Sequence, residues 1–293
     1  MEINTVGFVG VGTMGRGMVK NLAKKGFNVL AYNRTKEKIM DLNGKNIQVV
    51  DSVKEACKGE AVITCLPNDE AVRDVVFGEE GIIKNMQGKI FIDCGTTSVD
   101  MTRKISNASK NKIEFLDSPI TGSKLGAEAG TMTMMIGGKK DIFDKCMPML
   151  KAIGKVHVYC GPATYGQRAK LALNMAMSML LESYLECLIF AVKNGVPLKA
   201  MEEIMENSAA KNGIGSFKMP YIRKRDFEQH FMLKLMYKDL SFAEREMKKL
   251  NLDLPLAKHI KGIFEKSLSR RDEDISTIVK ELEKKAGIEL KES

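Results

Sequence analysis

Two polar side chains, Lys170 and Asn174, interrupt an otherwise apolar stretch and are spaced for joint chemistry. Residues four apart on an α-helix share a face, so an ammonium and a carboxamide would point to the same side. A desolvated ammonium is a tunable proton donor, whereas a lysine that extends its amine into solvent has only a packing role. Spacing alone leaves both interpretations of Lys170 open.

A second polar group, Thr121, Gly122 and Ser123, follows a β-branched run at residues 112–116. A turn of this composition offers hydroxyls and backbone N–H groups to an anion. We therefore expect these three residues to bind a carboxylate.

A third motif, at residues 10–15, reads G-x-G-x-x-G between an apolar run at 6–9 and an amphipathic stretch at 14–25. In strand–loop–helix order this motif is typical of dinucleotide binding. The first glycine permits a tight turn, the second lets the backbone approach a pyrophosphate, and the third lets helix and strand pack closely. The helix N-terminus presents N–H groups to the phosphates. The predicted contacts are Gly10, Gly12, Thr13, Met14 and Gly15.

The end of the second predicted strand bears on which dinucleotide is bound. An enzyme specific for NAD usually has an acidic residue there, whereas this chain has Asn33, Arg34 and Thr35. A guanidinium can bind a 2′-phosphate through two hydrogen bonds, so we predict NADP(H) and a lower KM for NADPH than for NADH. A solvated basic helix start is the alternative interpretation.

Two further loops follow predicted strands, and the carboxyl ends of such strands line the cofactor site in an open parallel sheet. Leu66 and Pro67 lie in one loop and Thr96 in the other. We predict that all three contact the cofactor, although plain connecting loops would have the same composition.

The elements that carry these motifs change in kind near residue 163. Before it, β-branched runs alternate with amphipathic stretches, which predicts βαβ units in a mostly parallel sheet. After it, a continuous helix is expected over 165–193, about 40 Å long, ending at Asn194-Gly195 and followed by helices only. The predicted fold is α/β, with a Rossmann-type doubly wound domain at 1–163 and an all-helical domain at 164–293.

Composition limits the remaining function classes. Hydrophobic residues make up 44% and charged residues 28% of 293 residues, which is the globular range. No uninterrupted 18-residue apolar run occurs and no basic-then-apolar leader is seen, so we expect a cytoplasmic protein without a membrane span. The six scattered cysteines and three separated histidines favour neither disulfides nor a metal. The net charge of +9 suits an anionic cofactor and substrate, and with spread lysines and no tryptophan we expect no nucleic-acid partner.

The sequence closely resembles the β-hydroxyacid dehydrogenase family over almost its whole length. This family includes 3-hydroxyisobutyrate dehydrogenases, tartronate semialdehyde reductases and glyoxylate/succinic semialdehyde reductases. The resemblance rests on four motifs: Gly10–Gly15 with Asn21-Leu22, Asp117–Ser123, Gly166-x-x-x-Lys170-x-x-x-Asn174, and Lys238-Asp239-Leu240.

The resemblance implies roles for these residues. Lys170 would be the general acid/base, Asn174 would help to hold the substrate, and residues 121–123 would bind its carboxylate. Lys238 and Asp239 would lie near the nicotinamide and the substrate, and Thr96 near the nicotinamide ribose. The resemblance also implies that the helical domain at 164–293 is the substrate and oligomerisation domain, through which homodimers or homotetramers form.

Departures from the family pattern indicate a branch. The substrate loop has Gly122-Ser123 where the hydroxyisobutyrate branch usually has Gly-Gly, and Thr121 replaces a serine. The stretch from Phe231 to Asp239 looks like the glyoxylate/succinic semialdehyde reductase branch, in which the matching phenylalanine faces the substrate.

We therefore expect reduction of a small carboxylate-bearing aldehyde or 2-oxo acid with NADPH. The alternatives are a 3-hydroxyisobutyrate or other 3-hydroxyacid dehydrogenase, an imine reductase, and a non-catalytic NADP-binding protein. A 6-phosphogluconate dehydrogenase would need a much larger helical domain. The sequence leaves the physiological substrate and the favoured direction open.

Overall fold

The computed structural model describes residues 3–291 and divides into two compact units, one ending at Lys170 and one beginning at Leu171. The expected boundary at 163 falls where the last strand gives way to the long helix α8 (Tyr165–Lys193). The units divide slightly later because the first turn of α8 is hydrogen-bonded to the first unit.

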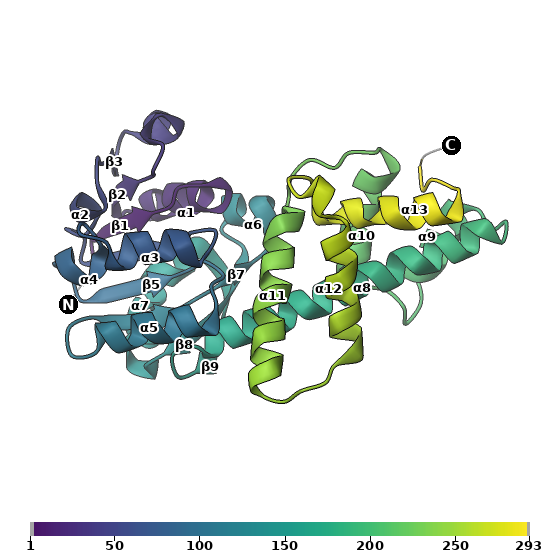
Figure 1. Cartoon of the computed structure of the whole chain (residues 1–293). Helices are drawn as coiled ribbons and strands as arrows, with labels where there is room; N and C mark the ends of the chain where they lie inside the picture. Colours follow the sequence, from purple (N-terminus) through teal and green to yellow (C-terminus); the bar gives the residue numbers. More distant parts are fainter. Residues whose placement is uncertain (1–2, 292–293) are drawn as a thin grey trace. The chain divides into compact units, whose positions relative to one another are not determined.

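The first unit is built on one nine-stranded sheet (Figure 1), in the order β3-β2-β1-β4-β5-β6-β8-β7, with β9 paired to β8. The six strands from β3 to β6 in this order are mutually parallel, while β8 runs antiparallel to β6 and β7. The strands are β1 (Thr5–Val9), β2 (Asn28–Tyr32), β3 (Ile47–Val49), β4 (Ala61–Thr64), β5 (Ile90–Asp93), β6 (Glu114–Asp117), β7 (Ile120–Thr121), β8 (Met132–Gly138) and β9 (Gly154–Gly161).

Helices cover both faces of this sheet, which explains why its central strands β4 and β5 are buried throughout and mostly apolar. One face packs against α1 (Thr13–Lys24), the 3-10 helix η1 (Lys36–Leu42), α6 (Ser123–Ala129) and α7 (Lys140–Ile153). The other packs against α2 (Val53–Ala56), α3 (Asp69–Phe77), α4 (Ile82–Asn85) and α5 (Val99–Ser109). Neighbouring side chains alternate between the faces, as Phe8 and Val9 do. The predicted doubly wound Rossmann-type architecture is confirmed.

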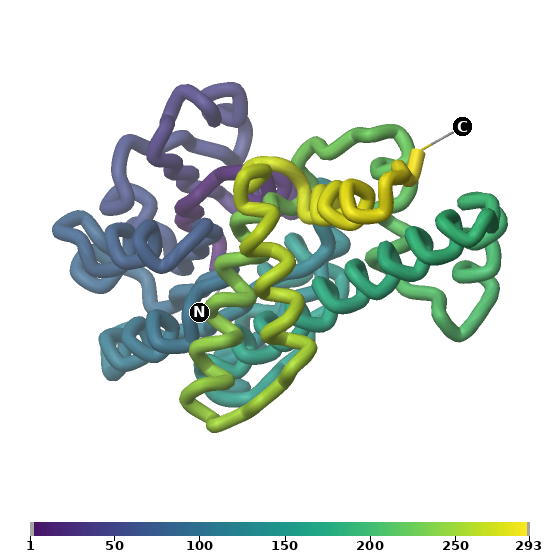
Figure 2. Tube along the Cα trace, turned by 45° about the vertical axis from the view of Figure 1, so that its right-hand side comes forward, coloured from purple at the N-terminus to yellow at the C-terminus, as the bar shows by residue number. Residues whose placement is uncertain are grey.

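The second unit is entirely helical over its described residues, also as predicted. After α8 it contains α9 (Leu198–Glu206), α10 (Gly213–Arg223), α11 (Leu233–Lys249), α12 (Pro255–Lys266), the 3-10 helices η2 (Leu268–Arg270) and η3 (Ile275–Ile278), and α13 (Val279–Ala286). Figures 1 and 2 show α11 and α12 side by side. Leu181, Leu185 and Leu188 of α8 pack in the apolar core of this unit.

Helix α8 has the predicted bounds and ends where glycine permits a left-handed residue. Gly195 has φ +86°, and the N–H of Val196 donates to the carbonyl of Ala191 at 3.0 Å, which closes the last turn. Among residues 3–291, α8 alone is long and apolar enough to cross a membrane, and the core helix of a globular domain meets the same criteria. Its apolar stretch is interrupted by Glu182 and Glu186.

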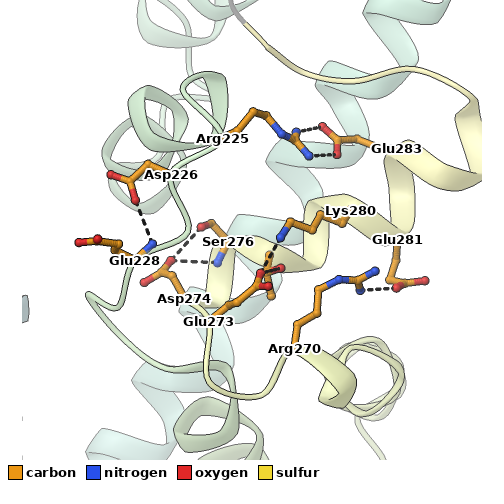
Figure 3. Close-up of polar contacts among 11 residues, drawn as sticks. Arg225, Asp226, Glu228, Arg270, Glu273, Asp274, Ser276, Lys280, Glu281 and Glu283 are labelled. Carbon is orange, nitrogen blue, oxygen red and sulfur yellow. Dashed lines mark hydrogen bonds and ion pairs between the residues drawn. The ribbon is translucent and has the colours of Figure 1, made fainter.

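Ion pairs tie the C-terminal helices of the second unit together (Figure 3). Arg225 binds Glu283 through two hydrogen bonds of 2.6 and 3.0 Å, and Arg270 pairs with Glu281 at 2.6 Å. Glu283 is buried, so its bidentate pair is stronger than an exposed one.

Candidate functional site

The glycine loop between β1 and α1 is tightly packed at two positions and open at the third. Gly10 has φ +97°, and a Cβ added there would lie 2.5 Å from the carbonyl oxygen of Cys65. A Cβ at Gly15 would collide with the carbonyl of Gly10 and lie 2.9 Å from the ring of Phe8. A Cβ at Gly12, in contrast, would meet no heavy atom within 4 Å. The loop therefore leaves open space at the glycine that a pyrophosphate must approach.

Helix α1 starts at this open position. Gly12 is its N-cap and makes no side-chain cap, so the first-turn N–H groups at Thr13, Met14 and Gly15 are left for a ligand. Uncapped N–H groups and the positive end of the helix dipole both favour an anion. These residues fit a dinucleotide, and their individual contacts with it stay predictions.

The turn after β2 presents one arginine that is not engaged elsewhere. Asn33 shapes the turn by donating from Nδ2 to the carbonyl of Thr35 at 2.9 Å. Arg34 is exposed and forms no ion pair with any residue from 3 to 291. Arg16, by comparison, is bound to both carboxylate oxygens of Asp41, at 2.6 and 2.8 Å. Arg34 is thus available to an anionic group at the carboxyl end of β2.

The loops after β4 and β5 lie beside the glycine loop. A Cβ at Gly10 would be 2.8 Å from the Leu66 side chain, and one at Gly95 would be 2.6 Å from the Leu66 carbonyl oxygen. The two loops are joined where Asp69 accepts hydrogen bonds from the N–H and the hydroxyl of Ser98, at 2.9 and 2.6 Å. Thr96 is half-buried in the second of these loops, and Pro67 is exposed in the first.

The candidate substrate turn is more strained than the sequence indicates. Thr121 ends the short strand β7, which was not predicted, and Ser123 begins α6. Gly122 has φ +142° and Ser123 has φ +61°, a left-handed value that is rare outside glycine. Strained residues of this kind cluster at functional sites, and Thr121 and Ser123 both remain partly exposed.

A buried carboxylate, Asp117, holds the start of α8 against the sheet. Its two oxygens accept from the N–H groups of Thr164 and Gln167 at 2.7 and 2.8 Å. Burial raises the pKa of Asp117 to about 6, although these N–H groups lower it. We predicted this motif but not the capping role of its aspartate, because the partner lies 50 residues away in the sequence.

Lys170 lies on the same α8 turn and is 6% exposed, which does not fit a lysine extended into solvent. One turn later, Asn174 donates from Nδ2 to Asp239 of α11 at 2.7 Å. Lys238 lies 3.1 Å from the other carboxylate oxygen of Asp239. The second unit thus brings Asn174 to Asp239 and its neighbour Lys238, which lie more than 60 residues later in the sequence.

The hydrogen bond to Asp239 fixes the orientation of the Asn174 carboxamide. Its Oδ1 atom is buried and accepts no hydrogen bond from any residue between 3 and 291. A buried acceptor without a donor is costly, so it marks a place where a ligand donor would be stabilised.

The turn that carries Phe231 is fixed by a buried ion pair. The Phe231 N–H donates to Asp274 at 2.9 Å, and Asp274 pairs with Lys218 of α10 at 2.7 Å, both side chains being 2% exposed. Asp274 also accepts from Ser276 (Figure 3). Phe231 itself is half-buried. Sequence reasoning missed Lys218 and Asp274, because neither belongs to a recognisable motif.

The described residues show no other obvious reaction centre. No group of three or more His, Cys, Asp or Glu side chains within 3–291 could hold a metal ion. The six cysteines are free, and burial raises the pKa of Cys65 to about 12, so its thiol is not a ready nucleophile.

Known proteins match the chain over both units. Residues 5–161 match the NAD binding domain of 6-phosphogluconate dehydrogenase, and residues 164–282 match the NAD-binding domain of NADP-dependent 3-hydroxyisobutyrate dehydrogenase. The chain belongs to the β-hydroxyacid dehydrogenase family. As in this family, it is an NAD(P)-dependent oxidoreductase that acts on the CH–OH group.

Three members of the β-hydroxyacid dehydrogenase family show the extent of the similarity. The 2-(hydroxymethyl)glutarate dehydrogenase of Eubacterium barkeri is 30% identical, over 97% of this chain and 97% of its own. Glyoxylate/succinic semialdehyde reductase 1 of Arabidopsis thaliana is 31% identical, over 94% of this chain and 96% of its own. A solved Mycobacterium tuberculosis 3-hydroxyisobutyrate dehydrogenase with L-serine has TM-score 0.86 and 26% identity, covering 96% of this chain and 99% of its own.

Proposed function

We propose that the chain reduces a small carboxylate-bearing aldehyde or 2-oxo acid, such as glyoxylate or succinic semialdehyde, to the hydroxy acid with NADPH. The observation that carries this proposal is the pair on one face of α8: a buried Lys170, and an Asn174 whose amide is held by Asp239 so that its Oδ1 atom is left to accept.

Each of the candidate site residues would have a separate role in this reduction. A bound reduced nicotinamide would supply the hydride to the carbonyl carbon. Lys170, as an ammonium, would donate a proton to the carbonyl oxygen as negative charge develops on it, which typically accelerates a reaction by about 10²- to 10⁴-fold. The hydroxyls and N–H groups of Thr121 and Ser123 would hold the substrate carboxylate. The Asn174 Oδ1 atom would accept from the hydroxyl of the product.

The preference for NADPH rests on Arg34. Its exposed guanidinium, free of ion pairs to residues 3–291, stands at the carboxyl end of β2, where the adenosine ribose binds in doubly wound sheets. A 2′-phosphate would gain a charged partner there, whereas the ribose hydroxyls of NADH would not.

The names of the relatives support a class of substrate, but they do not single out one member of it. The relatives named above act on glyoxylate, succinic semialdehyde, 2-(hydroxymethyl)glutarate or 3-hydroxyisobutyrate according to their names. All of these are small molecules that carry a carboxylate as well as the reacting carbon, at different distances from it, and the turn at Thr121–Ser123 would hold that carboxylate. A 3-hydroxyisobutyrate dehydrogenase is therefore the second candidate.

The test is a substrate panel with NADPH as reductant, followed by the loss of nicotinamide absorbance. The panel contains glyoxylate, succinic semialdehyde, methylmalonate semialdehyde and tartronate semialdehyde, with a cyclic imine as the control for imine reduction. We expect turnover on at least one carboxylate and none on the imine. Tight NADPH binding with no turnover on any carboxylate would instead support a binding protein or an imine reductase.

We also propose a cytoplasmic homodimer or homotetramer that assembles through the helical unit, with no nucleic-acid or membrane partner. In support of assembly, α8 exposes two large apolar side chains, Phe190 at 71% and Leu180 at 45%, and burying them against a second copy would be favourable. Sedimentation should show an oligomer that Phe190→Glu weakens.

A further inference from the structure

The carboxamide of Gln167 is fully buried, and both its nitrogen and its oxygen form hydrogen bonds. Its Nε2 group donates to the carbonyl of Gly95 at 2.7 Å, and its Oε1 atom accepts from the N–H of Thr97 at 3.2 Å. The side chain therefore pairs with the loop after β5 much as a neighbouring strand would. The residue enclosed between these two bonds is Thr96, the predicted neighbour of the nicotinamide ribose.

Gln167 also lies three residues before Lys170 on α8, so the two side chains belong to successive positions of one helical face. The turn that carries them cannot shift easily. Asp117 accepts from the N–H of Gln167 itself at 2.8 Å, and a Cβ at Gly166 would collide with the carbonyl of Met135 and lie 2.7 Å from that of Asp117. The backbone of this turn is thus packed directly on the sheet.

We propose that Gln167 is a positioning residue that sets the distance between the cofactor loop at Thr96 and the proton donor Lys170. The proposal rests on the proposed function, in which these two residues serve hydride transfer and proton transfer. Because the two events occur on adjacent atoms of one carbonyl group, both must be aligned at the same moment. A neutral amide is suited to this task, since it fixes the loop without adding charge beside the reaction centre.

The first test replaces Gln167 by leucine, which has nearly the same size and cannot form either hydrogen bond. We expect kcat to fall by roughly 10- to 100-fold, the range expected for a misplacement of about 1 Å, while NADPH affinity and the substrate KM change little. Gln87→Leu, a change at an exposed glutamine of the same unit, is the matched control and should leave kcat unchanged.

The second test uses Gln167→Glu, which distinguishes a positioning role of this side chain from a general loss of structure in the variant. A protonated carboxyl has one donor and one acceptor, as the amide has, whereas the ionised form repels the Gly95 carbonyl. The ratio of kcat for this variant to that of wild type should therefore rise as the pH falls, and Gln167→Leu should show no such recovery.

The outcomes are distinguishable. The positioning role is refuted if both variants turn over at the wild-type rate, or if they lose kcat, NADPH affinity and melting temperature together without recovery at low pH. The proposed function fails separately if Lys170→Ala, with its fold intact, retains wild-type turnover. Loss of kcat in both Lys170→Ala and Gln167→Leu, with pH-dependent recovery in Gln167→Glu, supports both.

Discussion

Replacing Arg34 by alanine should weaken the use of NADPH and leave the use of NADH almost unchanged. The guanidinium is exposed and makes no ion pair with residues 3–291, so its removal breaks no interaction within the described fold. A hydrogen bond to a charged group contributes about 1.5–3 kcal/mol, and the lower part of this range applies to an exposed pair. About 1.5–2 kcal/mol corresponds to a loss of about 10- to 30-fold in kcat/KM for NADPH.

The assay is kcat/KM for NADPH and for NADH with one saturating substrate at low ionic strength. Added salt should reduce the NADPH advantage of the wild type, because it screens an exposed charge pair. Arg103→Ala is the matched control, since Arg103 is a surface arginine on α5 that pairs with Asp100 at 2.8 Å. An unchanged NADPH/NADH ratio in Arg34→Ala would refute the assignment of this residue to the 2′-phosphate.

Three further predictions concern contacts within each unit. Gly12→Val should fold normally but lose NADPH binding by titration, whereas Gly15→Ala should lower the melting temperature, because only the second change places a Cβ against backbone. Burial raises the pKa of Asp117 to about 6 from an ordinary 3.8, so this carboxyl favours the folded state below about pH 4 and loses that contribution as the pH rises through about 6. Asp117→Asn should remove about 3 kcal/mol of this pH dependence in urea unfolding. Lys218→Met should cost about 3–5 kcal/mol of unfolding free energy by leaving Asp274 as a buried unpaired charge, and equal stability would contradict the buried pair.

The architecture was predictable because local patterns and global topology agree in this chain. Alternating apolar runs and amphipathic stretches predicted the parallel sheet, and apolar helical spacing without a proline, ended by Asn194-Gly195, predicted the bounds of α8. Less regular segments were not predicted. Strand β7 has only two residues and no periodicity to read, and the amphipathic segment at 36–42 forms a 3-10 helix, which such a short pattern does not distinguish from an α-helix.

The sequence predicted only those parts of the site whose reactive residues lie close together in the chain. The loop at Gly10–Gly15 and the pair of Lys170 and Asn174 are local patterns, so their spacing was informative. The network that holds them depends on partners far apart in the chain, as in the bonds from Gln167 to residues 95 and 97. The sequence shows a glutamine three residues before Lys170, but nothing in it indicates that this side chain is buried or which loop it contacts.

The most direct test of the central claim is single-turnover reduction of the preferred substrate by NADPH with wild type and Lys170→Ala. If Lys170 is the proton donor, the variant should fold and bind NADPH as the wild type does, yet its rate should fall by about 10²- to 10⁴-fold. A folded variant that reduces the substrate at close to the wild-type rate would contradict the account.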